Sequence, residues 1–564
     1  MRSNHDVVAE IGRVTARRRN PKVAGIGLCL ALLSGCAQGQ APEMTAVESP
    51  PDPSPTPFLP STATPTPETV SVWIAPSVPP EARGLFLDSL SILGWPVLVA
   101  QDESAASVRL VPDGGMPFAR WTYALVAPFP TVEDSFSIEE FGAEWRGEAE
   151  NGWQILVTPS VRTLLEARLG SPGPEVIEAP AGFLVDQAWE SRPSLSLVPF
   201  ESLGLRWKVL EVEGQSPIRK DFDPASYPFD VVFGLEGDPG TVSRIAEALG
   251  LPENVSRNRR SDRLTTVVVT GVTALTRATA WRMEARGVNY PAELIGAWLS
   301  QADITHISNE VSFKPDCPPP TGNLNILLFC SLPGHIALLE TVGADVVELT
   351  GNHVLDAGRD AFMYSMDLYE ARGWPTFGGG RNLSLAGKPA LFEHNGNRFA
   401  FLGCNEAGPP GAWARDDSPG AMPCGEDRLL PEIGALRGEG YLPFFTFQWH
   451  EHYVPFPYSN QREVFRAAAQ AGAAVVSGSQ AHQPMGFEFE GESLVHYGLG
   501  NLFFDQMWSQ SVRQEFIDRY VVYEGRVVSL ELLTAVLEDW AQPRPMTPAE
   551  RTDFLDMIFS ASGW

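Results

Sequence analysis

Apolar runs separated by amphipathic stretches dominate the second half of the chain. The run at 265–270 is almost continuously β-branched, which is typical of a strand buried on both faces of a parallel or mixed sheet. Further strands are predicted at 302–310, 345–349, 398–403 and 474–477, and helices at 293–301, 334–342, 360–372 and 461–471. Strands that alternate with helices predict an α/β domain, which we place at residues 264–564.

A second α/β pattern lies at residues 70–263. Short strand-like runs at 70–74, 97–100 and 229–234 alternate with helical stretches such as 160–169. The pattern resembles that of the two-lobed substrate-binding proteins of bacterial transport systems, but no ligand motif accompanies it. A purely structural α/β domain is the alternative.

Polar residues follow the predicted strands of residues 264–564 where each strand ends. Asn352 and His353 come directly after the strand at 345–349, and Glu310 ends the strand at 302–310. Open α/β sheets place their sites just past the carboxyl ends of strands. An Asn carbonyl oxygen can ligate a metal ion, and a neighbouring imidazole can donate a proton or stabilise an oxyanion. The pattern therefore predicts a site for metal-assisted hydrolysis, with ordinary loop capping by Asn-His as the alternative.

Several of these polar segments, taken in order, resemble motifs of the CapA family of capsule and poly-γ-glutamate biosynthesis proteins. They are Ser308-Asn309-Glu310, Thr350-Gly351-Asn352-His353, Gln448-Trp449-His450-Glu451-His452-Tyr453, Gln480-Ala481-His482 and the stretch from His496 to Asp505. The resemblance runs from about Thr266 to about Asp505. It implies a metallophosphoesterase-like α/β sandwich for residues 264–564.

The chain departs from the family pattern at expected metal ligands. Val272 stands where the family has an Asp after Gly271, and a valine cannot bind a cation. Gln448 replaces a His, His452 replaces a Glu, and Gln480 replaces the first His of a His-Pro-His element. An amide is a poorer ligand than an imidazole or a carboxylate, so the expected metal cage is depleted.

The remaining donors still suffice for one divalent ion, Zn²⁺ or Mn²⁺. The ligands implied are Glu310, Asn352, His450 and His482, with His353 as general acid and Asp356 orienting it. His450 and His452 would point to the same side of a strand, which permits a local metal pair. The alternative is that these histidines only form hydrogen bonds around an inactive cleft.

The charge balance restricts the partners of the protein. The chain has 41 basic and 69 acidic residues, a net charge of −28, which opposes binding to nucleic acid and to anionic lipid surfaces. The same negative charge repels a polyanion such as poly-γ-glutamate. Local cations or a bound metal must then offset it, and Arg277, Arg359 and Arg381 are the candidate cations.

The first residues predict export and lipid anchoring. Arginines at 13 and 17–19 precede an apolar stretch at 23–33 that is too short for a membrane span, and Leu33-Ser34-Gly35-Cys36 reads as a bacterial lipobox. We therefore expect a signal peptide at 1–36, lipidation of Cys36 and an extracytoplasmic place in the cell envelope. A plain signal peptide or a short anchor helix is the alternative. Residues 37–69 are rich in Pro, Ser and Thr and predict an extended tether.

Four cysteines outside the leader fit an exported protein. Pairing of neighbours gives Cys317 with Cys330 and Cys404 with Cys424. A four-thiol zinc site is the alternative, although Cys-x-x-Cys spacing is absent.

Two functional hypotheses follow. The first is a lipid-anchored, metal-dependent hydrolase that acts in the synthesis, attachment or export of a capsular polymer. The second is a noncatalytic lipoprotein that binds the polymer or assembles its machinery, with a degenerate metal site. Both imply the capsular polymer or its precursor and membrane capsule-synthesis proteins as partners. Trp508 and Trp540 are expected to be packing residues, with a sugar-stacking platform as the alternative.

Overall fold

The computed structural model describes residues 69–149 and 152–564. The predicted leader at 1–36, the lipidation residue Cys36 and residues 37–68 of the predicted tether lie outside the described residues. All described residues belong to one compact unit, Thr66–Trp564. Within the described part of the chain, no helix is long and apolar enough to cross a membrane.

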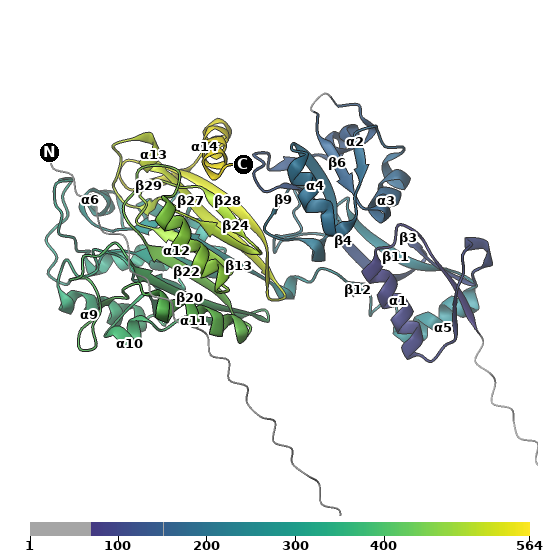
Figure 1. Ribbon diagram of the computed structural model, residues 1–564, viewed down its shortest axis with the longest axis horizontal. Helices are drawn as coiled ribbons and strands as arrows, with labels where there is room; N and C mark the ends of the chain where they lie inside the picture. The colour runs from purple at the N-terminus through teal and green to yellow at the C-terminus, as the bar shows by residue number, and fades with distance from the viewer. Residues whose placement is uncertain (1–68, 150–151) are drawn as a thin grey trace, which may run out of the picture. The chain divides into compact units, whose positions relative to one another are not determined.

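The N-terminal half of this unit is built on one mixed sheet (Figure 1), with strands in the order β2-β1-β3-β11-β4-β8-β6-β7. The strands are β1 (Val70–Ile74), β2 (Val97–Val99), β3 (Val108–Pro112), β4 (Met116–Pro128), β6 (Gln154–Val157), β7 (Val176–Glu178), β8 (Ser194–Pro199) and β11 (Asp230–Gly237), and β9 (Trp207–Val209) and β12 (Ser256–Arg257) pair with β4. The helices are α1 (Pro80–Ile92), α2 (Ile138–Arg146), α3 (Pro159–Leu169), α4 (Leu184–Glu190) and α5 (Pro239–Leu249).

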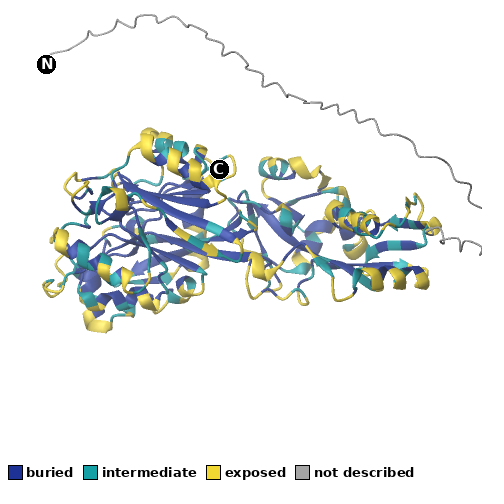
Figure 2. Cartoon of the chain, turned by 90° about the horizontal axis from the view of Figure 1, so that it is seen from below, coloured by how far each residue is buried: buried dark blue, intermediate teal, exposed yellow. Residues whose placement is uncertain are grey.

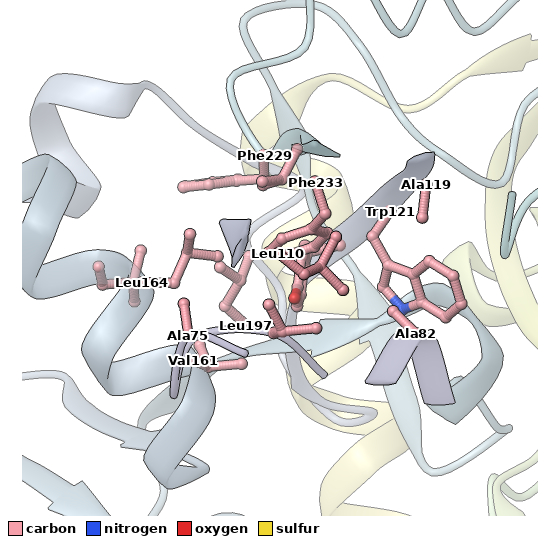
Figure 3. Close-up of a cluster of buried hydrophobic side chains, with 14 of the residues drawn as sticks. Ala75, Ala82, Leu110, Ala119, Trp121, Val161, Leu164, Leu197, Phe229 and Phe233 are labelled. Atoms are coloured by element: carbon pink, nitrogen blue, oxygen red, sulfur yellow. The ribbon is translucent and has the colours of Figure 1, made fainter. Parts of the chain in front are cut away.

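Most apolar side chains from the strands and helices of this half share one core, and Leu184 and Ala188 of α4 belong to a second cluster. Figure 3 shows Ala82 of α1 and Leu164 of α3 together with Trp121 and Phe233 of the central strands. The α/β class predicted for residues 70–263 is therefore confirmed. The predicted boundary between residues 263 and 264 falls between β12, the last strand of this sheet, and β13, the first strand of the next.

The C-terminal half contains two larger sheets. The first has the order β17-β16-β15-β13-β27-β28-β29, and β14 pairs with both β15 and β26. Its strands are β13 (Leu264–Thr270), β14 (Val272–Thr273), β15 (Ile304–Asn309), β16 (Val346–Glu348), β17 (Thr376–Phe377), β26 (Asn501–Phe503), β27 (Gln514–Tyr523), β28 (Arg526–Glu538) and β29 (Gln542–Pro545). The second sheet, in the order β19-β20-β22-β23-β25-β24, contains β19 (Ala390–His394), β20 (Asn397–Asn405), β22 (Leu442–Gln448), β23 (Val475–Ser479), β24 (Phe487–Glu490) and β25 (Ser493–His496).

Helices cover the outer faces of both sheets (Figure 1). The helices of this half are α6 (Arg277–Arg286), α7 (Gly296–Ser300), α8 (Ile336–Thr341), α9 (Arg359–Glu370), α10 (Leu383–Ala386), α11 (Glu426–Gly438), α12 (Ser459–Gln470), α13 (Gln510–Arg513) and α14 (Pro548–Ser562). Helix α14 is the exception among these, because its Phe554 and Ile558 belong to the apolar core between the two sheets. Most exposed residues lie on helices and loops, whereas the strands are largely buried (Figure 2).

The two sheets pack face to face through a common core. Val267 of β13 and Tyr520 of β27 belong to the same apolar cluster as Phe401 of β20 and Phe444 of β22. Separate clusters join the outer faces to α8 and α9 on one side and to α11 and α12 on the other. The layers are therefore helix, sheet, sheet and helix, and the predicted α/β sandwich is confirmed.

Strand β13 shows why the sequence pattern was informative. All seven of its residues are buried, because it lies between parallel β15 and antiparallel β27 and is covered on both faces.

The predicted helix at 293–301 is shorter in the structure. Pro291 lies in a 3₁₀ turn at Tyr290–Ala292, and a separate helix, α7, begins only at Gly296.

Both predicted disulfides are present. Cys317 is bonded to Cys330 and Cys404 to Cys424, over separations of 13 and 20 residues. These bonds use all four cysteines of the described residues, so the alternative of a four-thiol zinc site is wrong.

Candidate functional site

The candidate site lies where β15, β16, β22 and β23 end. Ser308 of β15 and Ser479 of β23 come from different sheets, and their hydroxyl oxygens are 3.2 Å apart. Face-to-face packing of the sheets therefore brings the polar residues after these strands to one place. The close approach also explains a glycine, because a Cβ at Gly351 would lie 2.7 Å from the Cα of Glu310.

Glu310 is buried, and neither of its carboxylate oxygens has a hydrogen-bond partner in the protein. Burial is the largest effect on its pKa, which rises from 4.5 to about 7, and the charges of Asp356 and Glu451 add to the rise. The positive charge of His353 acts in the opposite direction. An unpartnered buried carboxyl group is costly for a fold, so Glu310 is a strong functional candidate.

His353 and Asp356 form the predicted contact. The Nδ1 atom of His353 lies 2.7 Å from Oδ2 of Asp356, which also accepts a hydrogen bond of 3.1 Å from the backbone N–H of Phe329. The ring of Phe329 packs 4.3 Å from the imidazole. Burial, the largest effect, lowers the pKa of His353, but the Asp356 hydrogen bond and the charge of Glu310 leave it above its ordinary value. The geometry fits an oriented proton donor, and the catalytic role stays a prediction.

Three amide side chains form a hydrogen-bonded series next to this pair. The Nε2 atom of Gln448 donates to Oδ1 of Asn352 at 3.1 Å and to Oε1 of Gln480 at 2.6 Å. Gln480 adopts the left-handed backbone conformation, with φ of 72°, which is unfavourable for a residue other than glycine. Thus two residues at expected ligand positions bind each other, and the predicted ligand Asn352 accepts a protein donor. We call Asn352, Gln448 and Gln480 the amide series.

His482, which follows the end of β23, is held by a hydrogen bond to Asn501 of β26. Its Nδ1 atom lies 2.8 Å from Oδ1 of Asn501, so the neutral ring carries its proton on Nδ1 and leaves the Nε2 lone pair free. Burial is the main reason that the pKa of His482 falls to about 4. The Nε2 atom is 4.0 Å from a carboxylate oxygen of Glu451. This ring retains the orientation that a metal-binding histidine needs.

His450 and His452 do not form the predicted pair on one side of a strand. Strand β22 ends at Gln448, so the alternation of a strand does not extend to them. His450 is exposed and its ring lies 5.2 Å from that of Trp449. His452 is buried against the ring of Tyr458 at 4.2 Å, and burial lowers its pKa.

The donor set does not fit a metal pair. Across residues 69–149 and 152–564, no three His, Cys, Asp or Glu side chains are grouped so that they could hold a metal ion. Val272 is buried in an apolar cluster with Phe329 and Phe504. Glu310 and the Nε2 atom of His482 are the donors still suited to a single ion, and that single-ion hypothesis stays a prediction.

Arg277 and Asp505 form a buried ion pair that the sequence did not reveal. The guanidinium donates through Nε at 3.2 Å and through Nη2 to the carboxylate, which also accepts from the backbone N–H of Ala278 at 2.8 Å. Arg277 lies over the rings of Phe329 and Phe504, at 4.8 and 5.0 Å. Asp505 balances the charge of Arg277, so Arg277 does little to offset the net negative charge of the protein. Arg381, another candidate cation, pairs with Asp367 and Glu370 instead.

Trp508 is not a packing residue, contrary to expectation. It is 61% exposed, and its ring contacts that of Tyr453 at 5.4 Å. No local sequence signal indicates this, because exposure of an aromatic residue in a loop depends on the tertiary fold. Trp540 is 36% exposed, with the guanidinium of Arg282 at 5.3 Å from its ring.

Comparison with known sequences bears on the C-terminal half. Residues 266–506 match the family model of the bacterial capsule synthesis protein PGA_cap. The capsule biosynthesis protein CapA of Bacillus anthracis is 25% identical over 218 residues, which are 38% of this chain and 53% of that protein. The PGA biosynthesis protein CapA of Bacillus subtilis (strain 168) is 25% identical over 191 residues, 34% and 50% of the two chains. The chain thus spans about half the length of these curated relatives, and the predicted CapA relationship is confirmed for the matched segment.

Comparison with solved structures finds partial likenesses. An ABC-type phosphate transport receptor from Vibrio cholerae has 11% identity and a TM-score of 0.29, covering 33% of this chain and 94% of that chain. A 5'-nucleotidase precursor from Thermus thermophilus has 12% identity and a TM-score of 0.32, covering 53% and 58%. At TM-scores of this size, neither likeness supports an inference about ligand or activity.

Glu310→Gln should remove a pH dependence of stability. Because folding raises the pKa of Glu310 from 4.5 to about 7, its favourable contribution is complete below pH 4.5 and is lost as pH rises to about 7. With a chelator present, the unfolding free energy of Glu310→Gln relative to wild type should rise by about 3 kcal/mol across this interval. Urea unfolding of both proteins at a series of pH values measures the difference. A difference that does not change with pH would contradict the burial of a partnerless carboxyl group.

Proposed function

Because residues 266–506 match a capsule synthesis family, we propose that this protein acts in the biosynthesis of a capsular or poly-γ-glutamate-type polymer at the cell envelope. The names of both curated relatives describe capsule or PGA biosynthesis. Residues from four of the segments that carry the resemblance come together where β15, β16, β22 and β23 end. The two disulfides support a place outside the cytoplasm, where such bonds persist. The lipobox ending at Cys36 supports attachment to the membrane through a lipid.

The mode of action proposed is binding of the polymer, without metal-dependent hydrolysis. The amide series carries this proposal, since Gln448 holds Asn352 and Gln480 by hydrogen bonds where the family pattern expects ligands. Amide groups donate and accept hydrogen bonds with neutral or charged polymers but are weak ligands for Zn²⁺ or Mn²⁺. Membrane capsule-synthesis proteins are the proposed protein partners.

A single-ion hydrolase is the second candidate, and the unpartnered carboxylate of Glu310 favours it. Glu310, His482 and Asn352 would hold the ion, whose chemistry is to lower the pKa of a bound water toward neutrality. His353, oriented by Asp356, is positioned to donate a proton to a leaving group. The exposed His450, predicted as a fourth ligand, would have to turn inward from its present place.

Deletion of the gene should reduce the polymer on the cell surface, and the wild-type gene should restore it. Gln448→Leu should fail to restore it, because both acceptors of the amide series lose their donor. Arg381→Ala is the control and should restore the polymer, since this arginine forms its ion pairs with two exposed acids, Asp367 and Glu370. The measurement is the amount of extracted surface polymer, with folding of each variant checked by its melting temperature. An unchanged amount of polymer after deletion would contradict the proposed function.

Cys36→Ser should release the protein from the membrane fraction or leave its leader unprocessed, because the serine hydroxyl is not a lipid acceptor in this motif. Metabolic labelling with a radioactive fatty acid measures the modification. Cys29→Ser is the matched control, since Cys29 lies within the expected leader, and it should keep the label. Unchanged labelling of Cys36→Ser would overturn the lipoprotein assignment.

A further inference from the structure

Two aromatic side chains are exposed beside the candidate site. Trp508 is 61% exposed and Tyr453 is 42% exposed, although burial of such large apolar surfaces would ordinarily be favourable. Their ring centres are 5.4 Å apart and their planes meet at 67°, so the two rings support each other edge to face. We call Tyr453 and Trp508 the aromatic platform.

The aromatic platform continues into the candidate site. The ring of Tyr453 lies 6.4 Å from that of His482, with only 27° between the planes. His482 in turn lies 5.5 Å from the buried ring of Phe504. A ligand stacked on the platform would therefore have its next unit close to His482.

The charges around the platform are mostly acidic. The carboxylate of Glu451 accepts a hydrogen bond from the Tyr453 hydroxyl and lies 4.0 Å from Nε2 of His482. Glu310 is a further acidic group nearby, buried and without a hydrogen-bond partner, and Asp356 is paired with His353. The charge of the neighbouring Arg277 is neutralised by Asp505. With a net charge of −28 on the whole chain, these surroundings disfavour a polyanion.

A neutral sugar ring suits these features. The C–H groups on one face of a pyranose are polarised positive and are attracted to the negative face of an aromatic ring. Sugar hydroxyls donate hydrogen bonds to carboxylates such as that of Glu451. Binding sites of this kind combine apolar surface with a few polar groups that fix orientation.

We propose that Tyr453 and Trp508 bind neutral sugar units of the polymer by stacking, and that they present the chain to the residues around His482. This inference rests on the proposed function and names its substrate class, a polysaccharide rather than poly-γ-glutamate. Tyr453 and Trp508 are binding residues in this account, and neither takes part in a chemical step.

The test measures binding of three neutral probes, maltohexaose, cellohexaose and chitohexaose, to the intact exported protein by titration calorimetry. At least one should bind, and Trp508→Ala should weaken that binding roughly tenfold or more, as loss of a stacking partner requires. Trp508→Phe should retain most of the affinity because it keeps a ring. Phe183→Ala is the matched control, since Phe183 is also 61% exposed but lies in the N-terminal half, and it should bind as wild type does.

Several outcomes would overturn the inference. They are failure of all three hexasaccharides to bind, equal binding by Trp508→Ala, and binding of poly-γ-glutamate that depends on Trp508. A dimer in solution that dissociates in Trp508→Ala would assign the platform to a second copy of the chain instead. Comparison with the gene deletion distinguishes failure of the sugar-binding proposal from failure of the proposed function. Loss of surface polymer without saccharide binding would refute the platform alone, whereas saccharide binding with no effect of deletion would refute the capsule role alone.

Discussion

The face-to-face packing of two sheets is the constraint on which the candidate site depends. Phe444 of β22 packs 5.3 Å from Phe401 of the same sheet and 5.4 Å from Tyr520 of the opposite sheet. Such an aromatic-rich core fixes the distance between sheets, since dense packing leaves little freedom to slide. As a result, the ends of β15 and β16 meet those of β22 and β23, and residues from four separate segments of the chain share one small volume.

That shared volume is unusual in its chemistry. It contains a carboxyl group without a partner, a neutral histidine with a free Nε2 lone pair and a His353–Asp356 pair. Side-chain amides, bonded to each other, occupy positions where the family pattern expects imidazoles. This arrangement supports the proposal that the fold is kept while the set of metal ligands is reduced. The aromatic platform beside it offers contacts that need no metal, which agrees with a binding role.

Much of the fold follows from local sequence patterns, but the site does so only in part. The β-branched run in β13 predicted a strand covered on both faces, and short spacings predicted both disulfides, because each property depends on neighbouring residues. The contact of His353 with Asp356 spans three residues and was likewise predictable. By contrast, Gln448 contacts residues 96 and 32 positions away. The exposure of Trp508 and of His450 depends on the path of their loops through the tertiary fold, and no periodic pattern in the sequence predicts that path.

The metal content of the purified protein tests the central claim most directly, namely that the amide series has replaced a working metal centre. The exported protein would be equilibrated with Zn²⁺ or Mn²⁺, freed of excess ion by gel filtration and analysed by plasma mass spectrometry. The account predicts no stoichiometric ion, and no change in metal content on His482→Ala. One tightly bound ion per chain that is lost in His482→Ala would contradict it and would establish the single-ion hydrolase in its place.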